Sequence, residues 1–162
     1  MPLLLGLDER PEEPLLHIHR AAVVPVAIEE TFAFFAEAAN LERLTPSWLS
    51  FSIRTPHPIV MGVGTVIDYR ISMRGLPLPW RSRIDVWEPG IRFVDRQIVG
   101  PYRWWRHEHR FQRVPAGTLV LDDVEYLPRM RLFSRRLVER DLARIFDYRQ
   151  HSLQRIFAER LA

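Results

Sequence analysis

The sequence predicts an α+β protein in which a curved antiparallel sheet of seven strands wraps around one long C-terminal helix, with two short helices after the first strand. Three observations predict this architecture. Residues 65–126 alternate apolar and polar side chains with a period of two, which is typical of strands with one buried face. The breaks between these strands are short, and short connections favour antiparallel neighbours. Residues 131–161 change to a period of 3.6, so the chain ends in an amphipathic helix.

Each element has its own boundary signals. Residues 1–14 are expected to form a loose lead-in, and residues 15–162 a single domain. The predicted helices are 28–39, a short turn that begins at Asn40, and 131–161. The predicted strands are 15–24, 48–55, 65–73, 80–87 and three more between Arg92 and Tyr126.

The C-terminal helix is expected to hold the core together. With about 30 residues it would be about 45 Å long, so it must lie across the sheet for its full length. One apolar stripe at spacings of three and four residues should face the sheet. The stripe consists of Leu142, Ile145, Phe146, Leu153, Ile156 and Phe157.

The composition excludes several functional classes. The chain has 162 residues, 47% of them hydrophobic, which predicts one folded core and not a disordered chain. The absence of Cys excludes disulfides and thiolate chemistry, and the absence of Lys excludes Schiff-base chemistry on a lysine. No apolar run is long enough for a membrane span, and the start lacks the pattern of a signal peptide. We therefore expect a cytoplasmic protein.

The charge pattern does not indicate a nucleic-acid partner. All 23 basic residues are Arg, and the formal net charge is only +3. Nucleic-acid-binding proteins usually concentrate their positive charge, whereas here Arg and acidic residues alternate along the strands, as in Arg106, Glu108 and Arg110. This alternation predicts a solvated, salt-bridged sheet face.

The last three strands carry an unusual mixture of side chains on the opposite face. The period of two places Trp105, His107, His109 and Phe111 together on one strand. The flanking strands add Phe93, Asp95 and Gln97 on one side and Asp122 and Tyr126 on the other. Aromatic side chains mixed with His, Asp and Gln indicate the lining of a cavity with a few polar groups.

These elements and several sequence phrases resemble a known family. The phrases are NLERLTPSWLSFSI (40–53), GTVIDYRI (64–71), GLPLPWRSRIDVWEPGIRFVDRQIVGPYRWW (75–105), HEHRF (107–111) and DDVEY (122–126). They resemble the SRPBCC family of the START/Bet v1-like helix-grip superfamily, in its bacterial ligand-binding or polyketide cyclase/dehydrase-like subgroup. The resemblance covers residues 15–160. It implies a deep hydrophobic cavity between helix and sheet, and a sheet whose first strand pairs with both the last and the second. It does not imply one reaction.

A metal site is not expected from the histidines. The spacing of His107 and His109 places both imidazoles on one side of a strand, as metal ligands require. A cupin-type motif would need a Glu a few residues later, where this chain has Arg113 and Val114. His17 and His19 could complete a four-His site only if the first and sixth strands met. We therefore expect no metal and no cofactor.

Catalysis remains an alternative interpretation of the same face. His107, His109 and Asp122 are the candidate catalytic residues, with Asp95 and Tyr126 as further acid/base groups. An Asp–His–Tyr arrangement could catalyse the cyclisation or dehydration of a keto substrate without metal, as a lyase or isomerase. The competing interpretation is a closed hydrogen-bond network that supports the sheet. The Ser residues lack the elbow motif of a Ser–His–Asp hydrolase.

Our leading hypothesis is a binding protein for a small hydrophobic or aromatic molecule. The expected ligand-binding residues are Tyr69, Trp80, Phe93, Asp95, Gln97, Trp105, His107, His109, Phe111, Tyr126 and Phe146. The two alternatives are a cyclase/dehydratase-like enzyme and a protein-interaction module. The module would use an exposed patch of Tyr102 and Trp104, which also predicts a weak homodimer.

Overall fold

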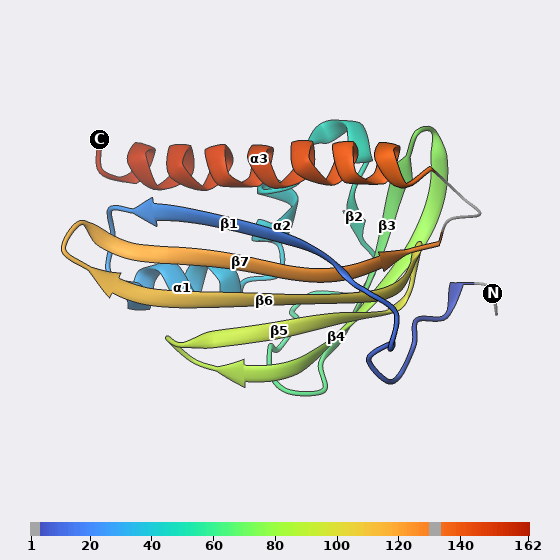
Figure 1. Cartoon of the computed structure of the whole chain (residues 1–162). Coiled ribbons are helices and arrows are strands. Elements are labelled where there is room, and N and C mark those ends of the chain that lie inside the picture. The colour runs from blue at the N-terminus through green and yellow to red at the C-terminus, as the bar shows by residue number, and fades with distance from the viewer. Residues whose placement is uncertain (1–3, 130–133) are drawn as a thin grey trace.

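The computed structural model describes residues 4–129 and 134–162, and it has the predicted α+β architecture (Figure 1). Its seven-stranded sheet has the order β1-β7-β6-β5-β4-β3-β2, and every neighbouring pair is antiparallel. The strands are β1 (Leu16–Val24), β2 (Ser52–Ile53), β3 (Val66–Met73), β4 (Leu76–Glu88), β5 (Arg92–Val99), β6 (Tyr102–Val114) and β7 (Gly117–Pro128). The expectation that β1 also pairs with β2 is wrong, because these strands form opposite edges of the sheet.

The helices follow the predicted order with shifted boundaries. They are α1 (Ile28–Ala36), α2 (Asn40–Arg43), a 3₁₀ helix (Ser47–Leu49) and α3 (Arg135–Arg160). Helix α1 ends earlier than expected because Glu37 is extended, and the Asn40 side chain then donates a hydrogen bond to the Phe34 carbonyl. The strand predicted over 48–55 shortens to β2 because Trp48 belongs to the 3₁₀ helix.

Helix α3 lies along the sheet, as its apolar stripe predicts (Figure 1). Ser134 caps its first turn by accepting a hydrogen bond from the backbone N–H of Leu137. The first residues of the predicted helix, 131–133, lie outside the described residues. The stripe is buried from Leu142 to Phe157, except that Ile145 is half-buried.

The tip of the β3–β4 hairpin is tied to α3. Arg74 and Gly75 form its two-residue turn, both with positive φ, which suits the twist of a tight hairpin. The Arg74 guanidinium makes two hydrogen bonds of 3.0 Å to the carboxylate of Asp141 on α3. Sheet and helix are thereby joined at one end of the space between them.

Two of the three apolar clusters in the described residues lie at opposite ends of the long strands. One packs Phe32 and Phe35 of α1 against Phe93, Phe111 and the far end of α3. The other, around the start of α3, is built from Tyr102, Trp105, Val124, Tyr126 and Phe146. His109 stacks on Phe93 of the first cluster, and His107 contacts Phe146 of the second. A pair of histidines therefore lies between the two clusters.

The predicted exposed patch of Tyr102 and Trp104 does not exist. Their side chains are only 2% and 5% exposed. A register shift between them breaks the alternation at the start of β6, so Tyr102 joins Trp105 in the core. Trp104 instead contacts Arg96, whose guanidinium carbon lies 5.4 Å from the centre of the indole ring. The structure therefore does not support the interaction surface inferred from these residues.

The segment before β1, expected to be a loose lead-in, hydrogen-bonds to the sheet near Trp104. The Gly6 N–H donates to Ile98 O at 3.0 Å, and the Leu7 N–H donates to Arg103 O at 2.8 Å. Gly6 lies so close to β5 that a Cβ there would be 2.7 Å from Gln97 O, which explains why a glycine suits this position. None of the helices in the described part of the chain has the length and hydrophobicity of a membrane span.

Candidate functional site

A cavity of about 190 Å³ opens between α3 and the inner face of the sheet. Strands β3 to β6 form one wall, and α1, α2, α3, the 3₁₀ helix and the connecting segments contribute the other side chains. Eight of the eleven predicted ligand-binding residues line it. They are Tyr69, Trp80, Phe93, Asp95, Trp105, His107, His109 and Phe146.

The other three predicted residues have structural positions nearby. Gln97 closes the β5–β6 turn, where its amide donates to Tyr102 O at 2.8 Å and accepts from the Tyr102 N–H at 3.2 Å. Phe111 packs into the aromatic cluster under α1, and Tyr126 packs against Trp105. Their inward orientation agrees with the alternation, but the cavity does not extend to them.

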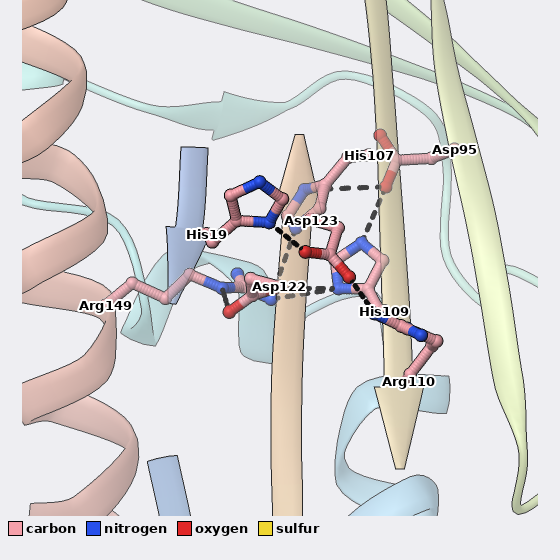
Figure 2. Close-up of polar contacts among 8 residues, drawn as sticks. All are labelled: His19, Asp95, His107, His109, Arg110, Asp122, Asp123 and Arg149. Carbon is pink, nitrogen blue, oxygen red and sulfur yellow. Dashed lines mark hydrogen bonds and ion pairs between the residues drawn. The ribbon is translucent and has the colours of Figure 1, made fainter. Parts of the chain in front are cut away.

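The two histidines lie in the polar part of the wall, and each bonds to a carboxylate on a neighbouring strand (Figure 2). His107 Nε2 is 2.7 Å from Asp122 Oδ1 on β7, and His109 Nε2 is 2.8 Å from Asp95 Oδ2 on β5. The two imidazole rings stack with their centres 3.7 Å apart. Each bond runs diagonally across the antiparallel register: His107 is opposite Val124 on β7 and bonds to Asp122 two residues away, and His109 is opposite Phe93 on β5 and bonds to Asp95 two residues away.

Arg149 of α3 completes the polar cluster and was missed by the sequence analysis. Its Nη2 donates to His109 Nδ1 at 3.2 Å, and its Nε donates to Asp122 Oδ2 at 3.3 Å. The guanidinium also lies over Phe35, 5.4 Å from the ring centre. A signal was present, because Arg149 follows Leu142 and Phe146 at helical spacing and therefore interrupts the apolar stripe.

Burial sets the ionisation of this cluster. Burial, reinforced by the neighbouring His109, lowers the pKa of His107 to about 4 despite the bond to Asp122, so His107 is neutral at pH 7. Burial acts to raise the pKa of both Asp95 and Asp122. For Asp122, the charge of Arg149 and the histidine bonds outweigh burial and bring the pKa well below its usual range. For Asp95, bonding to His109 and the surrounding positive groups also leave the pKa lowered.

Two acceptors in the cavity wall remain available. None of the described residues donates a hydrogen bond to His107 Nδ1 or to the second oxygen of Asp95. The Tyr69 hydroxyl also lines the cavity, and burial, followed by the charge of Asp95, raises its pKa. Tyr69 therefore stays protonated and can donate. A neutral imidazole anchored to a carboxylate, with its other nitrogen free, can accept a hydrogen bond or a proton.

The same residues could be considered for a metal ion. Ligand atoms of Asp95, His107 and His109 lie within 4.8 Å of one another. However, His109 Nε2 already bonds to Asp95, and the cationic Arg149 lies 3.2 Å from the other nitrogen of that ring. The four-His arrangement does not form, because β1 pairs with β7 and the exposed His19 bonds to Asp123 on the outer face.

Comparison with known proteins shows likeness in structure only. No protein-family model matches the sequence, and no curated protein is similar to it in sequence. The Zhui aromatase/cyclase from Streptomyces sp. R1128 superposes with a TM-score of 0.74 at 16% identity, over 92% of this chain and 97% of that one. A protein from Thermus thermophilus gives 0.70 at 15% identity, over 92% and 100%. The major latex-like protein 151 from Panax ginseng gives 0.64 at 9% identity, over 88% and 97%.

These likenesses cover nearly the whole domain and share one architecture, a curved antiparallel sheet around a long C-terminal helix. They agree with the resemblance inferred from the sequence phrases. At such low identity they establish the fold and leave the activity to the residues of the site. The chain has the helix-grip fold.

Proposed function

We propose that this protein binds a small hydrophobic or aromatic molecule in the cavity between the sheet and α3. The observation that carries the proposal is the cavity itself, about 190 Å³ with mostly apolar walls and one polar cluster. An engineered apolar cavity of about 150 Å³ in another protein binds benzene, so this volume suits a ligand of about one substituted ring. Cavities of this kind bind by apolar contact and orient the ligand through a few polar groups.

The lining suggests how such a ligand would lie. Trp80 and Trp105 meet edge to face with their ring centres 5.2 Å apart, and Phe146 faces Trp105 from α3. These rings would contact the apolar body of the ligand. The polar end would reach His107 and Asp95, whose available acceptors lie on the same wall.

A second candidate function is a cyclase/dehydratase-like reaction, and one contact favours it. His107 Nε2 is anchored to Asp122 at 2.7 Å, while Nδ1 has no hydrogen bond from the described residues. This is the arrangement of a general base. In this reaction His107 would take a proton from a carbon beside a carbonyl group, and the Tyr69 hydroxyl would donate to the carbonyl oxygen. The fold likeness to an aromatase/cyclase supports testing this chemistry.

Ligand capture tests the binding proposal directly. Native mass spectrometry of protein purified from its own host should show a bound molecule of about 100–200 Da, because the cavity admits nothing much larger than about one substituted ring in this conformation. Isothermal titration calorimetry with p-xylene should show binding at one site. If neither a captured molecule nor p-xylene binding is found, the binding proposal is wrong.

Two variants separate the binder from the enzyme. In a binder, the double change His107→Leu with His109→Leu should abolish selectivity for polar-headed ligands while p-xylene still binds. In an enzyme, His107→Gln should lower the turnover rate of a keto substrate and leave its affinity nearly unchanged. His19→Leu is the matched control for both, because His19 lies exposed on the outer face of β1.

A further inference from the structure

The charge inside the cavity is opposite in sign to that of the whole protein. The chain carries a formal net charge of +3. The cavity, by contrast, is lined by Asp95, and Asp122 lies directly behind its histidines. Arg149 is the one guanidinium among the lining residues that the structure describes. Two carboxylates, Asp95 and Asp122, therefore accompany one guanidinium, so the carboxylate and guanidinium groups at the polar wall leave an excess of negative charge.

The guanidinium of Arg149 is engaged and poorly placed to attract an anion. Its Nε bonds to Asp122 and its Nη2 to His109, at 3.3 and 3.2 Å. Its side chain is only 7% exposed, and Phe35 covers one face of the guanidinium. An anionic ligand would have to displace Asp122 from it. The positive charge of Arg149 thus stabilises the cluster, and it attracts the carboxylate of a ligand only weakly.

The groups that do face the cavity are mainly acceptors. One oxygen of Asp95 takes the contacts from His107 and His109, while the other is drawn without any (Figure 2). His107 Nδ1 lies 3.9 Å from the occupied oxygen and has no hydrogen-bond donor among the described residues. The side chains of His107 and Asp95 line the cavity and are 8% and 20% exposed, so a ligand that donates a hydrogen bond can meet these acceptors from the cavity.

We propose that the cavity selects uncharged aromatic molecules that carry a hydrogen-bond donor, a hydroxyl or amino group on the ring, and discriminates against aromatic carboxylates. The donor binds Asp95 or His107, and the ring packs against the aromatic walls. The proposal deepens the binding function proposed above and rests on it. It specifies that the protein accepts the hydrogen bond from the ligand and that the ligand carries no negative charge. Hydrophobic binding alone determines neither of these.

A series of para-substituted toluenes tests this selectivity on one ring size. Isothermal titration calorimetry at pH 7 compares the affinities of the wild-type protein for p-cresol, p-xylene and p-toluate. We expect p-cresol to bind about tenfold more tightly than p-xylene, since its hydroxyl meets an ionised acceptor. We expect p-toluate to bind at least about tenfold more weakly than p-xylene, because like charges repel in a buried site.

Asp95→Asn then identifies the group responsible. The change keeps the shape and removes the negative charge, so the preference for p-cresol and the penalty on p-toluate, each measured relative to p-xylene in the same variant, should both shrink. Asp123→Asn is the matched control, because Asp123 bonds to Arg110 and His19 on the outer face and should alter none of the three affinities.

The outcomes distinguish this inference from the underlying binding function. Equal affinity for p-xylene and p-cresol, or tighter binding of p-toluate, overturns the donor preference while leaving the cavity as a binding site. Absence of binding by all three probes overturns both. The wild-type series decides the matter by itself if Asp95→Asn does not fold.

Discussion

Strands β5, β6 and β7 carry a charge network on each face, and the two networks differ mainly in burial. On the outer face, Glu108 joins Arg92 and Arg106 at 3.3 and 3.0 Å, and Arg110 bonds to Asp123. On the inner face, Arg149 and the two histidines join Asp95 and Asp122 over similar distances. The side chain of Arg110 is 45% exposed and that of Arg149 only 7%.

The contrast shows that the same kind of ion pair contributes differently to stability on each face. Exposed ion pairs gain little, because water already solvates both charges and salt screens them. A buried charge cannot return to water, so each member depends on its partners. The outer network presents a charged surface to water, whereas the inner one supplies a fixed electrostatic environment for a ligand. Substitutions on the two faces should therefore have unequal effects.

The largest effect should come from removing the buried cation. Arg149→Met should lower the free energy of unfolding by about 3–5 kcal/mol, because Asp122 and Asp95 would stay buried without the guanidinium. Urea denaturation followed by circular dichroism measures the loss. Arg110→Met, the matched change on the outer face, should cost less than about 1 kcal/mol. Equal losses for the two variants would show that burial does not set the value of these pairs.

Alternation along the strands was sufficient to predict most of the inner network. The period of two placed His107, His109, Asp95 and Asp122 on one face, and antiparallel register then brought each imidazole to a carboxylate. The partner from the helix was harder to predict, because period alone does not say which turn of a helix meets which strand. Arg149 nevertheless interrupted the apolar stripe, and a charged residue at such a position indicates a buried partner.

The failure at Trp104 has a different physical origin. A register shift at the start of β6 buries Tyr102 in the core and breaks the alternation by which the patch was inferred. In addition, the segment around Gly6 and Leu7 hydrogen-bonds alongside β5 and β6. Neither the register shift nor the contact with the N-terminal segment leaves a local signal in residues 102–105. Both depend on chain segments elsewhere in the sequence.

The second largest effect should come from this covered part of the sheet. Trp104→Ala should cost about 3 kcal/mol in urea unfolding, because it removes a buried indole and leaves space under the N-terminal segment. Trp48→Ala serves as the control, since Trp48 is 39% exposed and should contribute much less. A loss below about 1 kcal/mol for Trp104→Ala would mean that the segment collapses onto the space or contributes little to stability.

The inner face should also respond to pH, through the buried His107. The pKa of His107 is about 4 in the folded protein, against 6.5 for a free side chain, so the unfolded chain takes up its proton first. Stability is therefore unaffected above about pH 6.5 and falls as the pH drops from there to about 4, by about 3 kcal/mol. The lowered pKa values of Asp95 and Asp122 add a further loss at still lower pH.

Urea denaturation between pH 7 and pH 4 checks this dependence. His107→Gln should remove most of the loss, because a glutamine keeps a donor for Asp122 and does not titrate. His151→Gln is the control, since His151 is exposed on α3. If His107→Gln keeps the same pH dependence as wild type, the loss must come from another group, and the burial of a neutral His107 is not its cause.

The smallest effect should be the response of the wild-type protein to zinc, which tests why the inner network is not a metal centre. Asp95, His107 and His109 have suitable ligand atoms, yet Arg149 holds a positive charge 3.2 Å from His109 Nδ1. Added Zn²⁺ should therefore leave the melting temperature unchanged. In Arg149→Met the repulsion is gone and the carboxylates lack a cation, so Zn²⁺ should raise the melting temperature.

The zinc experiment needs one safeguard on the outer face. His17 and His19 lie exposed on β1 with parallel rings, and they could bind zinc at the surface. Both proteins should therefore carry His19→Gln, which removes the surface pair without touching the cavity. Stabilisation of the protein that retains Arg149 would mean that the guanidinium moves aside for a metal ion. In that case the inner face would differ from the outer one in metal chemistry as well as in burial.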